Sequence, residues 1–248
     1  MKQLYQERIQ PHLLANYSVK PWQLITIKTI GIGESDIQQR LESLKLPEQV
    51  QLSFRTSSVE NQTKLLFPPE FSRSELETIS KQVAKLIGDP VFTIEGIDEN
   101  SGDLITILSH LLTTRKLTLA VAETISQGQI ASHCIGENWL IESLFCRDTL
   151  QLARKLDLPN MELAVEEEQR AQLAITFARQ LKTMSGADIG LAQLYFQDQT
   201  STTLLYTALV SATDVKSQLL KISGPIRRQQ NRATLHALDY VRRFVKDN

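Results

Sequence analysis

Hydrophobic and polar positions in the first hundred residues change period several times. Segments rich in Ile, Thr, Val and Phe that alternate with polar residues predict strands at 23–32, 50–55, 63–67 and 91–94. Apolar residues at helical spacing predict one helix that follows Ser35 and Asp36, whose side-chain oxygens can cap it, and a second at 72–87. Ser72 and Glu75 have the spacing of a capping box. The order strand, helix, strand, strand, helix, strand predicts a split β-α-β unit.

The pattern changes after a polar, acidic segment, Gly96–Gly102, which predicts a domain boundary. Helices are predicted at 103–114, from about 126, at 149–156, 166–184 and 227–245, and strands at 117–121, 139–146, 189–194, 203–210 and 216–222. The strand 117–121 is wholly apolar, as in a sheet that is covered on both faces. We therefore predict an α/β protein with a leader helix and connector at 1–20, an α+β domain at 21–97 and a layered α/β domain at 98–248.

Composition excludes several classes of protein. The 248 residues are 42% hydrophobic and 22% charged with a net charge of -1, which argues against general binding of nucleic acid. The sequence has no apolar run long enough to span a bilayer and no signal-peptide pattern, so we expect a cytoplasmic protein without membrane contact. Two cysteines and four scattered histidines form no zinc pattern, and neither a metal nor a cofactor is predicted.

The segment Thr118–Ser132 is predicted as strand, tight turn and helix start. Such a junction can present backbone N–H groups to a phosphate or expose a nucleophilic hydroxyl. The turn offers the Glu123 carboxylate, the hydroxyls of Thr124 and Ser126, and Gly128. On spacing alone, Ser126 is equally well a helix N-cap and Thr124 an ordinary residue at a strand end.

Basic residues suggest further contacts. Arg147, after a predicted strand, and Arg227 with Arg228, at a predicted helix start, are candidates to hold an anionic ligand, although solvated surface charges explain them as well. Cations in the last helical turn suit the helix dipole, so Arg242, Arg243 and Lys246 are expected to be a solvated helix end. The three acids Glu166–Glu168 are expected at a helix N-terminus.

Residues 119–131, LAVAETISQGQIA, resemble the Ala-Glu-Ser-Cys-Thr-Gly-Gly signature of the competence/damage-inducible CinA family, whose C-terminal domain includes nicotinamide mononucleotide deamidases. Thr29–Ser35 resembles the Gly-x-x-Glu-Ser turn of that family's KH-like middle domain, and Ser223-Gly224 with Arg232-Ala233-Thr234 resembles its ending. The resemblance implies a KH-like unit followed by a three-layer α/β/α domain, a homodimer, and a nucleotide-like small molecule as ligand. The family's N-terminal domain, which is related to molybdopterin-binding proteins, is not found in this sequence; Met1–Asn16 resembles its last helix.

Departures from the signature bear on the chemistry. The serine expected as nucleophile is Thr124, the cysteine is Ile125, and Gln127 replaces the first glycine, so that Glu123, Ser126 and Gly128 are what is retained. The family's Tyr-Ser-Asn-x-x-Lys segment corresponds to about 147–152, which contains neither tyrosine nor lysine. Its glycine-containing loop corresponds to 195–200, which contains no glycine.

These departures favour a CinA-like protein whose deamidase-type site is degenerate and that acts by binding, with Glu123, Gly128, Arg147 and Arg227 as candidate ligand contacts. The first alternative is a residual nicotinamide-nucleotide amidohydrolase that uses Thr124 or Ser126. The second alternative is nucleic-acid binding through the KH-like unit, against which Glu34 and the sparse basic residues around Gly31–Gly33 argue.

Overall fold

The computed structural model describes residues 4–17, 20–57, 60–158, 166–197 and 202–247. The chain divides into two compact units. The first comprises 1–56 and 61–98, and the second is built mainly from 99–248. The division between residues 98 and 99 lies within the segment Gly96–Gly102. No helix of the described part of the chain is long and apolar enough to cross a membrane.

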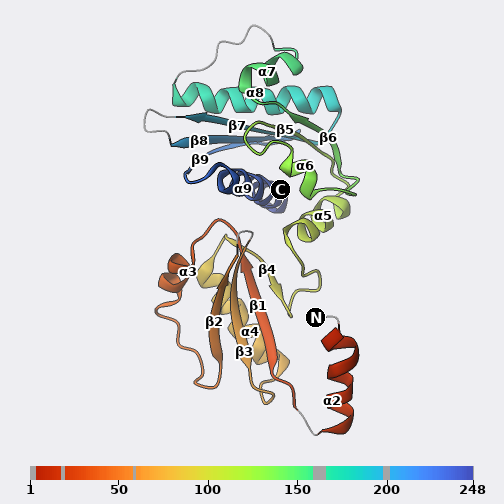
Figure 1. Ribbon diagram of the computed structural model, residues 1–248, viewed down its shortest axis with the longest axis vertical. Coiled ribbons are helices and arrows are strands. Elements are labelled where there is room, and N and C mark those ends of the chain that lie inside the picture. Colours follow the sequence, from red (N-terminus) through yellow and green to blue (C-terminus); the bar gives the residue numbers. More distant parts are fainter. Residues whose placement is uncertain (1–3, 18–19, 58–59, 159–165, 198–201, 248) are drawn as a thin grey trace. The chain divides into compact units, whose positions relative to one another are not determined.

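The first unit has the split β-α-β order that the sequence predicts (Figure 1). Its elements are the strands β1 (Gln23–Thr29), β2 (Gln51–Thr56), β3 (Asn61–Phe67) and β4 (Val91–Glu95) and the helices α3 (Glu34–Leu41) and α4 (Arg73–Ile87). The strands form an antiparallel sheet in the order β2-β3-β1-β4. Buried residues such as Ile27, Leu65 and Leu76 form its core. The helical leader consists of a π-helical segment, η1 (Tyr5–Ile9), and α2 (Gln10–Asn16).

Helix capping in this unit is predicted correctly in one case and wrongly in another. Ser72 caps α4, and the reciprocal bond from the Ser72 backbone to Glu75 completes the capping box. For α3, the N-cap is Gly33, so the prediction that Ser35 and Asp36 precede and cap this helix is wrong. Both residues lie inside the first turn, where an acid is favourable near the positive end of the helix dipole.

The second unit is a five-stranded mixed sheet between two layers of helices (Figure 1). Its strands are β5 (Leu119–Glu123), β6 (Leu140–Phe145), β7 (Ile189–Gln197), β8 (Thr203–Val210) and β9 (Val215–Ile222), in the order β6-β5-β7-β8-β9. The first three in this order are parallel, and β8 and β9 continue antiparallel. Helices α7 (Thr149–Lys155) and α8 (Glu167–Ser185) lie on one face, and α5 (Leu104–Thr114), α6 (Gln129–His133) and α9 (Ile226–Asp247) lie on the other.

Burial of β5 agrees with the prediction of a strand covered on both faces, because all five of its residues are buried. The larger core packs α8 against the sheet through residues such as Phe177, Leu181 and Tyr206. Gly190 marks the closest approach between these layers, since a Cβ atom there would lie 2.1 Å from the carbonyl oxygen of Ala178 in α8. Glycine therefore allows β7 to lie directly against the helix backbone.

Candidate functional site

The candidate residues share one edge of the second unit's sheet because of strand direction. The parallel strands β5, β6 and β7 end at this edge, and β9 ends there before α9 begins. Thr124 and Ser126 follow β5, Arg147 follows β6, and Arg227 lies in the first turn of α9. In open α/β sheets, ligands bind in the crevice outside the carboxyl ends of parallel strands. The topology therefore places the predicted residues where a ligand site of this fold class is expected.

The turn after β5 has an unusual backbone. Gln127 and Gly128 both have positive φ angles, 53° and 82°, and the backbone N–H of Gln129 donates to the carbonyl oxygen of Ser126 over 3.1 Å. Glycine adopts this region freely, whereas a residue with a Cβ atom pays a steric penalty there. The N-cap of α6 is Gly128, so the alternative reading of Ser126 as the N-cap is wrong.

Thr124 is closed off from solvent. Its hydroxyl donates to the carbonyl oxygen of Gln193 over 3.1 Å and accepts from the backbone N–H of Tyr195 over 3.2 Å, and the residue is fully buried. A nucleophilic hydroxyl has to transfer its proton to a base and reach a substrate carbonyl. A peptide carbonyl is not such a base, and both polar partners of this hydroxyl belong to the neighbouring strand. In this geometry Thr124 joins β5 to β7.

Ser126 takes part in a second buried group of polar side chains. Its hydroxyl lies 3.5 Å from Oε1 of Gln193, and Nε2 of Gln193 donates to the carbonyl oxygen of Ala233 over 2.9 Å and lies 3.5 Å from the Thr207 hydroxyl. Gln193 is thus central to the site, although it is not among the residues predicted from the sequence. The available signal was a lone amide inside the otherwise apolar strand 189–194, since a buried amide needs polar partners.

Glu123 contributes a buried carboxyl at the end of β5. Burial raises its pKa above the ordinary 4.5, while the Ser126 hydroxyl and the N–H groups of Ile130, Gly128 and Ala131 oppose part of the shift. These groups lie nearby, but neither carboxyl oxygen has a hydrogen bond of good geometry to the described residues. Burial is the larger effect, because an ionised carboxylate loses its hydration when it is enclosed.

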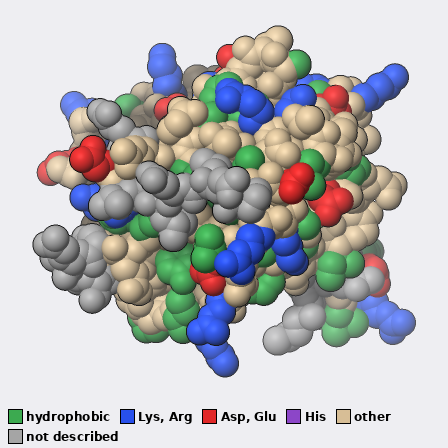
Figure 2. All heavy atoms as spheres, turned by 90° about the horizontal axis from the view of Figure 1, so that it is seen from above, with side chains coloured by type: hydrophobic (Ala, Val, Ile, Leu, Met, Phe, Trp, Pro, Cys, Tyr) green, Lys and Arg blue, Asp and Glu red, His purple; other side chains and the backbone are tan. Residues whose placement is uncertain are grey.

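Arg147, Arg227 and Arg228 are exposed. Among the described residues, no hydrogen bond or ion pair is found between them and the turn that contains Thr124 and Ser126. On the face shown in Figure 2, Lys and Arg side chains are interspersed with acidic and uncharged ones rather than gathered in one continuous patch. The structure therefore brings together Glu123, Thr124 and Ser126 with Gln193, and leaves the arginines as separate surface charges at the same edge.

The last turns of α9 differ from the solvated helix end that the sequence predicts. Arg242 is 3% exposed and donates to Asp239, which is 2% exposed, over 2.8 Å; Arg243 pairs with the other oxygen of Asp239 over 3.0 Å. The prediction of a wholly solvated cationic helix end is wrong, because a buried carboxylate needs compensating charge. The terminal Lys246 is exposed, in agreement with the prediction.

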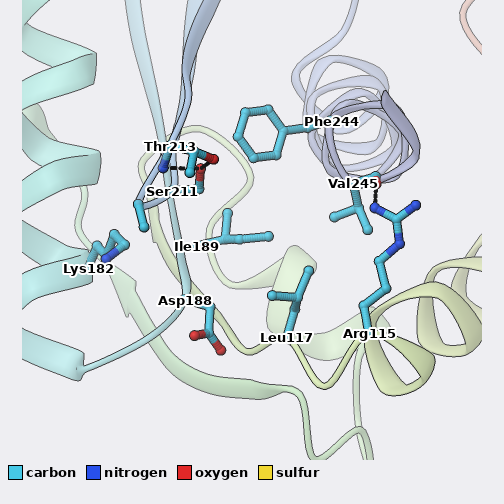
Figure 3. Close-up of a pocket in the computed structure, with 10 residues that line it drawn as sticks. Arg115, Leu117, Lys182, Asp188, Ile189, Ser211, Thr213, Phe244 and Val245 are labelled. Carbon is cyan, nitrogen blue, oxygen red and sulfur yellow. Dashed lines mark hydrogen bonds between the residues drawn. The ribbon is translucent and has the colours of Figure 1, made fainter. Parts of the chain in front are cut away.

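A cavity of about 360 Å³ lies at the opposite edge of the sheet, away from the turn (Figure 3). Its apolar wall consists of Leu117, Ile189, Phe244 and Val245, and the charged groups around it are Arg115, Lys182 and Asp188. The polar groups at the rim already have structural roles: Arg115 donates to the carbonyl oxygen of Val245 near the end of α9, and Asp188 accepts from the Thr118 backbone N–H over 2.9 Å and its hydroxyl over 2.7 Å. These bonds hold helix and strand ends together.

The fold and site together define an α/β protein with a buried hydroxyl- and carboxyl-containing turn at the carboxyl edge of a mixed sheet. No protein-family model matches the sequence. A CinA-like protein from Dictyoglomus thermophilum is 22% identical over 255 residues, covering 97% of this chain, and one from Shewanella halifaxensis is 24% identical over 254 residues, covering 98%. These similarities identify the chain as a CinA-like protein.

The similarity covers only part of the relatives. The chain spans 60% of the Dictyoglomus thermophilum protein and 59% of the Shewanella halifaxensis protein. A CinA-like protein from Flavobacterium psychrophilum is 34% identical over 138 residues, or 53% of this chain. Among solved structures, a competence or damage-inducible protein from Enterobacter asburiae matches 60% of this chain and 99% of its own at 19% identity, with a TM-score of 0.49.

Proposed function

We propose that this CinA-like protein carries a deamidase-type site that is catalytically silent toward nicotinamide mononucleotide, and that it binds a nucleotide-like anion at the carboxyl edge of its second unit. The observation that carries the proposal is the Thr124 hydroxyl. It occupies the place of the expected nucleophile, it is fully buried, and both of its hydrogen bonds join it to backbone groups of β7. Attack on a carboxamide would require breaking these bonds and opening the site.

The surroundings lack the other parts of such a catalyst. The segment that follows β6 in the family contains a tyrosine and a lysine, whereas residues 147–152 of this chain are Arg, Asp, Thr, Leu, Gln and Leu. Asp148 is used to cap α7, where it accepts from the Gln151 backbone N–H over 2.8 Å. Among the described residues, the Thr124 hydroxyl is hydrogen-bonded only to backbone groups of Gln193 and Tyr195, so no base accepts its proton and no cation stabilises a developing oxyanion there.

Binding is supported by the exposed cations at the same edge. Arg147 and Arg227 are exposed and can form charge-assisted hydrogen bonds with a phosphate, and guanidinium groups suit this ligand because they present paired donors. The positive end of the α9 dipole lies beside Arg227 and adds to the attraction.

Ammonia release from nicotinamide mononucleotide tests the catalytic half of the proposal. An active family member is assayed in parallel, and we expect no turnover by this chain above the buffer blank. Turnover that disappears in Thr124→Ala or Ser126→Ala would contradict the proposal. It would favour the residual amidohydrolase, for which the observation is the Ser126 hydroxyl near the Glu123 carboxyl, whose raised pKa suits a general base.

Calorimetric titration with nicotinamide mononucleotide tests the binding half. Arg147→Ala and Arg227→Ala are each expected to weaken binding about tenfold, which corresponds to roughly 1.4 kcal/mol, whereas Arg179→Ala on the exposed face of α8 serves as a matched control without effect. Binding that neither arginine substitution weakens would place the ligand elsewhere. A parallel titration with single-stranded RNA examines the second alternative, which predicts salt-sensitive, submicromolar binding.

A further inference from the structure

A cavity of the second unit lies at the edge of the sheet where the parallel strands begin (Figure 3). Its volume of about 360 Å³ falls within the range of small-molecule sites, which are mostly apolar and contain a few polar groups. The apolar wall is formed by Leu117, Ile189, Phe244 and Val245. We propose that this cavity binds a small aromatic carboxylate, whose ring packs against the apolar wall and whose carboxylate is held by Arg115.

The apolar wall is formed before any ligand arrives. Ile189, at the start of β7, and Phe244, near the end of α9, are both 2% exposed. The ammonium group of Lys216 lies 5.7 Å from the centroid of the Phe244 ring, and Lys216 in turn pairs with Asp247 over 3.0 Å. Two aromatic rings attract each other in edge-to-face or offset arrangements, beyond what their buried area supplies. The wall therefore favours a ligand with a ring.

The charged groups around the cavity are two cations and one acid. Among the described residues, neither Arg115 nor Lys182 forms an ion pair. The acid, Asp188, already accepts from the Thr118 backbone N–H over 2.9 Å and from the Thr118 hydroxyl over 2.7 Å. These two bonds, with a weaker contribution from Lys182, hold the pKa of Asp188 below its ordinary 3.8, so this carboxyl is ionised at neutral pH. The excess of one positive charge favours an anionic ligand.

Arg115 is the cation that is placed to hold a carboxylate. One of its terminal nitrogens, Nη1, donates to the carbonyl oxygen of Val245, which keeps the guanidinium beside the apolar wall. Among the described residues this guanidinium makes no further hydrogen bond, so its other N–H groups can donate to a ligand. Two N–H groups in one plane match the two oxygens of a carboxylate. Figure 3 shows Lys182 on the side of Ile189 away from Arg115, so Lys182 attracts the anion by charge and not by direct contact.

Ligands of other charge fit the cavity less well. An ammonium ligand would meet two cations, and Asp188, the acid at the cavity, is already bonded to Thr118. A neutral ring would use the apolar wall but would leave Arg115 without an ion-pair partner. These three classes of ligand differ in charge at the same ring size, so a series of matched probes distinguishes them.

Titration of the full chain with phenylpropanoate, phenylpropanamide and phenylpropylamine tests the proposal. The chain is isotope-labelled at its Ile δ1 methyl groups, so that Ile189 reports on the cavity and Ile130 in α6, at the other edge of the sheet, is the internal control. We expect phenylpropanoate to shift the Ile189 signal with a Kd on the order of 1 mM, as for other ligands with few atoms. The amide should bind about tenfold more weakly, and the amine more weakly still. Equal binding of the carboxylate and the amide, or a shift confined to other methyl groups, overturns the proposal.

Substitution of the cations locates the carboxylate of the ligand. Arg115→Gln is expected to weaken binding of phenylpropanoate about tenfold and to leave that of the amide unchanged, whereas Lys182→Gln should weaken it about twofold. Lys116→Gln removes a neighbouring exposed cation that does not line the cavity, and this matched control should bind as the wild type does. Unchanged binding by a folded Arg115→Gln chain overturns the proposal.

Filling the cavity is an independent test, needed because Arg115 also bonds to the end of α9 and its loss can unfold the chain. Ala212 lines the cavity from the turn between β8 and β9 and is exposed, so Ala212→Trp adds a large side chain without changing any charge. We expect this variant to unfold at the wild-type temperature and to lose the shift of the Ile189 signal. Ala212→Ser, which adds one hydroxyl, is the matched control and should still bind. A folded Ala212→Trp chain that binds phenylpropanoate as the wild type does overturns the proposal.

Discussion

The Thr124 hydroxyl joins the parallel strands β5 and β7. It donates to the carbonyl oxygen of Gln193 over 3.1 Å and accepts from the backbone N–H of Tyr195. The threonine is therefore part of the sheet's hydrogen bonding and extends the pairing of β5 with β7 by one residue. This role explains how a hydroxyl can be retained at a position where the sequence suggests a nucleophile. Catalysis would expose the hydroxyl, whereas joining strands requires it to be buried.

Replacement of Thr124 separates these roles. Thr124→Val keeps the shape but leaves the carbonyl of Gln193 and the N–H of Tyr195 without their side-chain partner, and we expect a loss of about 1–3 kcal/mol in the free energy of unfolding. Thr124→Ser keeps the hydroxyl and should cost less. Urea denaturation of the three proteins measures the difference. Equal stability of the valine variant and the wild type would show that the bridge contributes nothing.

Gly190 is expected to tolerate no side chain. A Cβ atom at this position would lie 2.1 Å from the Ala178 carbonyl oxygen, so Gly190→Ala has to push α8 away from β7. We expect a loss of about 3 kcal/mol or failure to fold, in the upper range for overpacked cores. Gly33→Ala is a suitable control, because its nearest contact would be 3.4 Å from the Asp36 carboxylate. Thermal unfolding compares the two variants.

The raised pKa of Glu123 predicts part of the pH dependence of the free energy of unfolding. Its pKa is raised in the folded state, so the folded protein keeps a proton that the unfolded chain releases above about 4.5. This carboxyl therefore favours folding most at low pH, and its contribution declines as the pH rises toward the folded-state pKa. Glu123→Gln should gain stability relative to the wild type across that window. A difference between the two proteins that is constant from pH 4.5 to 8 would contradict the shift.

His236 has the opposite effect on stability over a neighbouring range of pH. Burial, followed by the charges of Arg243 and Arg232, lowers its pKa from 6.5 to about 4. The unfolded chain takes up this proton first as the pH falls, so stability declines between about 6.5 and 4, by up to about 3 kcal/mol. His236→Gln should remove this decline, and His133→Gln, at an exposed position, should not. Urea denaturation at several pH values measures both variants against the wild type.

The sequence predicts the elements well because their signals are local. Periodicity locates the strands and long helices to within a few residues, and Ser72 with Glu75 identifies a capping box that the structure confirms. The turn after β5 is harder, since its helix begins at a glycine in a left-handed conformation and not at the hydroxyl of Ser126. Local pattern alone does not distinguish these two starts.

Contacts between distant segments account for the parts that the sequence does not predict. Gln193 acquires its role from Ser126, Thr207 and Ala233, which come from three other parts of the chain. Arg242 resembles an ordinary cation at a helix end, and its burial depends on how α9 packs. Its partner, Asp239, lies about one helical turn earlier on the same helix. The sequence shows this spacing, but exposed ion pairs on helices have the same spacing, so it does not predict burial.

Gln127 lies in the turn after β5, in a backbone conformation that glycine prefers. The residue already has the positive φ angle that glycine adopts freely, so the backbone path of a glycine pair is kept without the first glycine. Its side chain is exposed at the surface of the turn. A Gln127→Gly substitution would therefore remove the side chain above the turn without requiring a new backbone conformation.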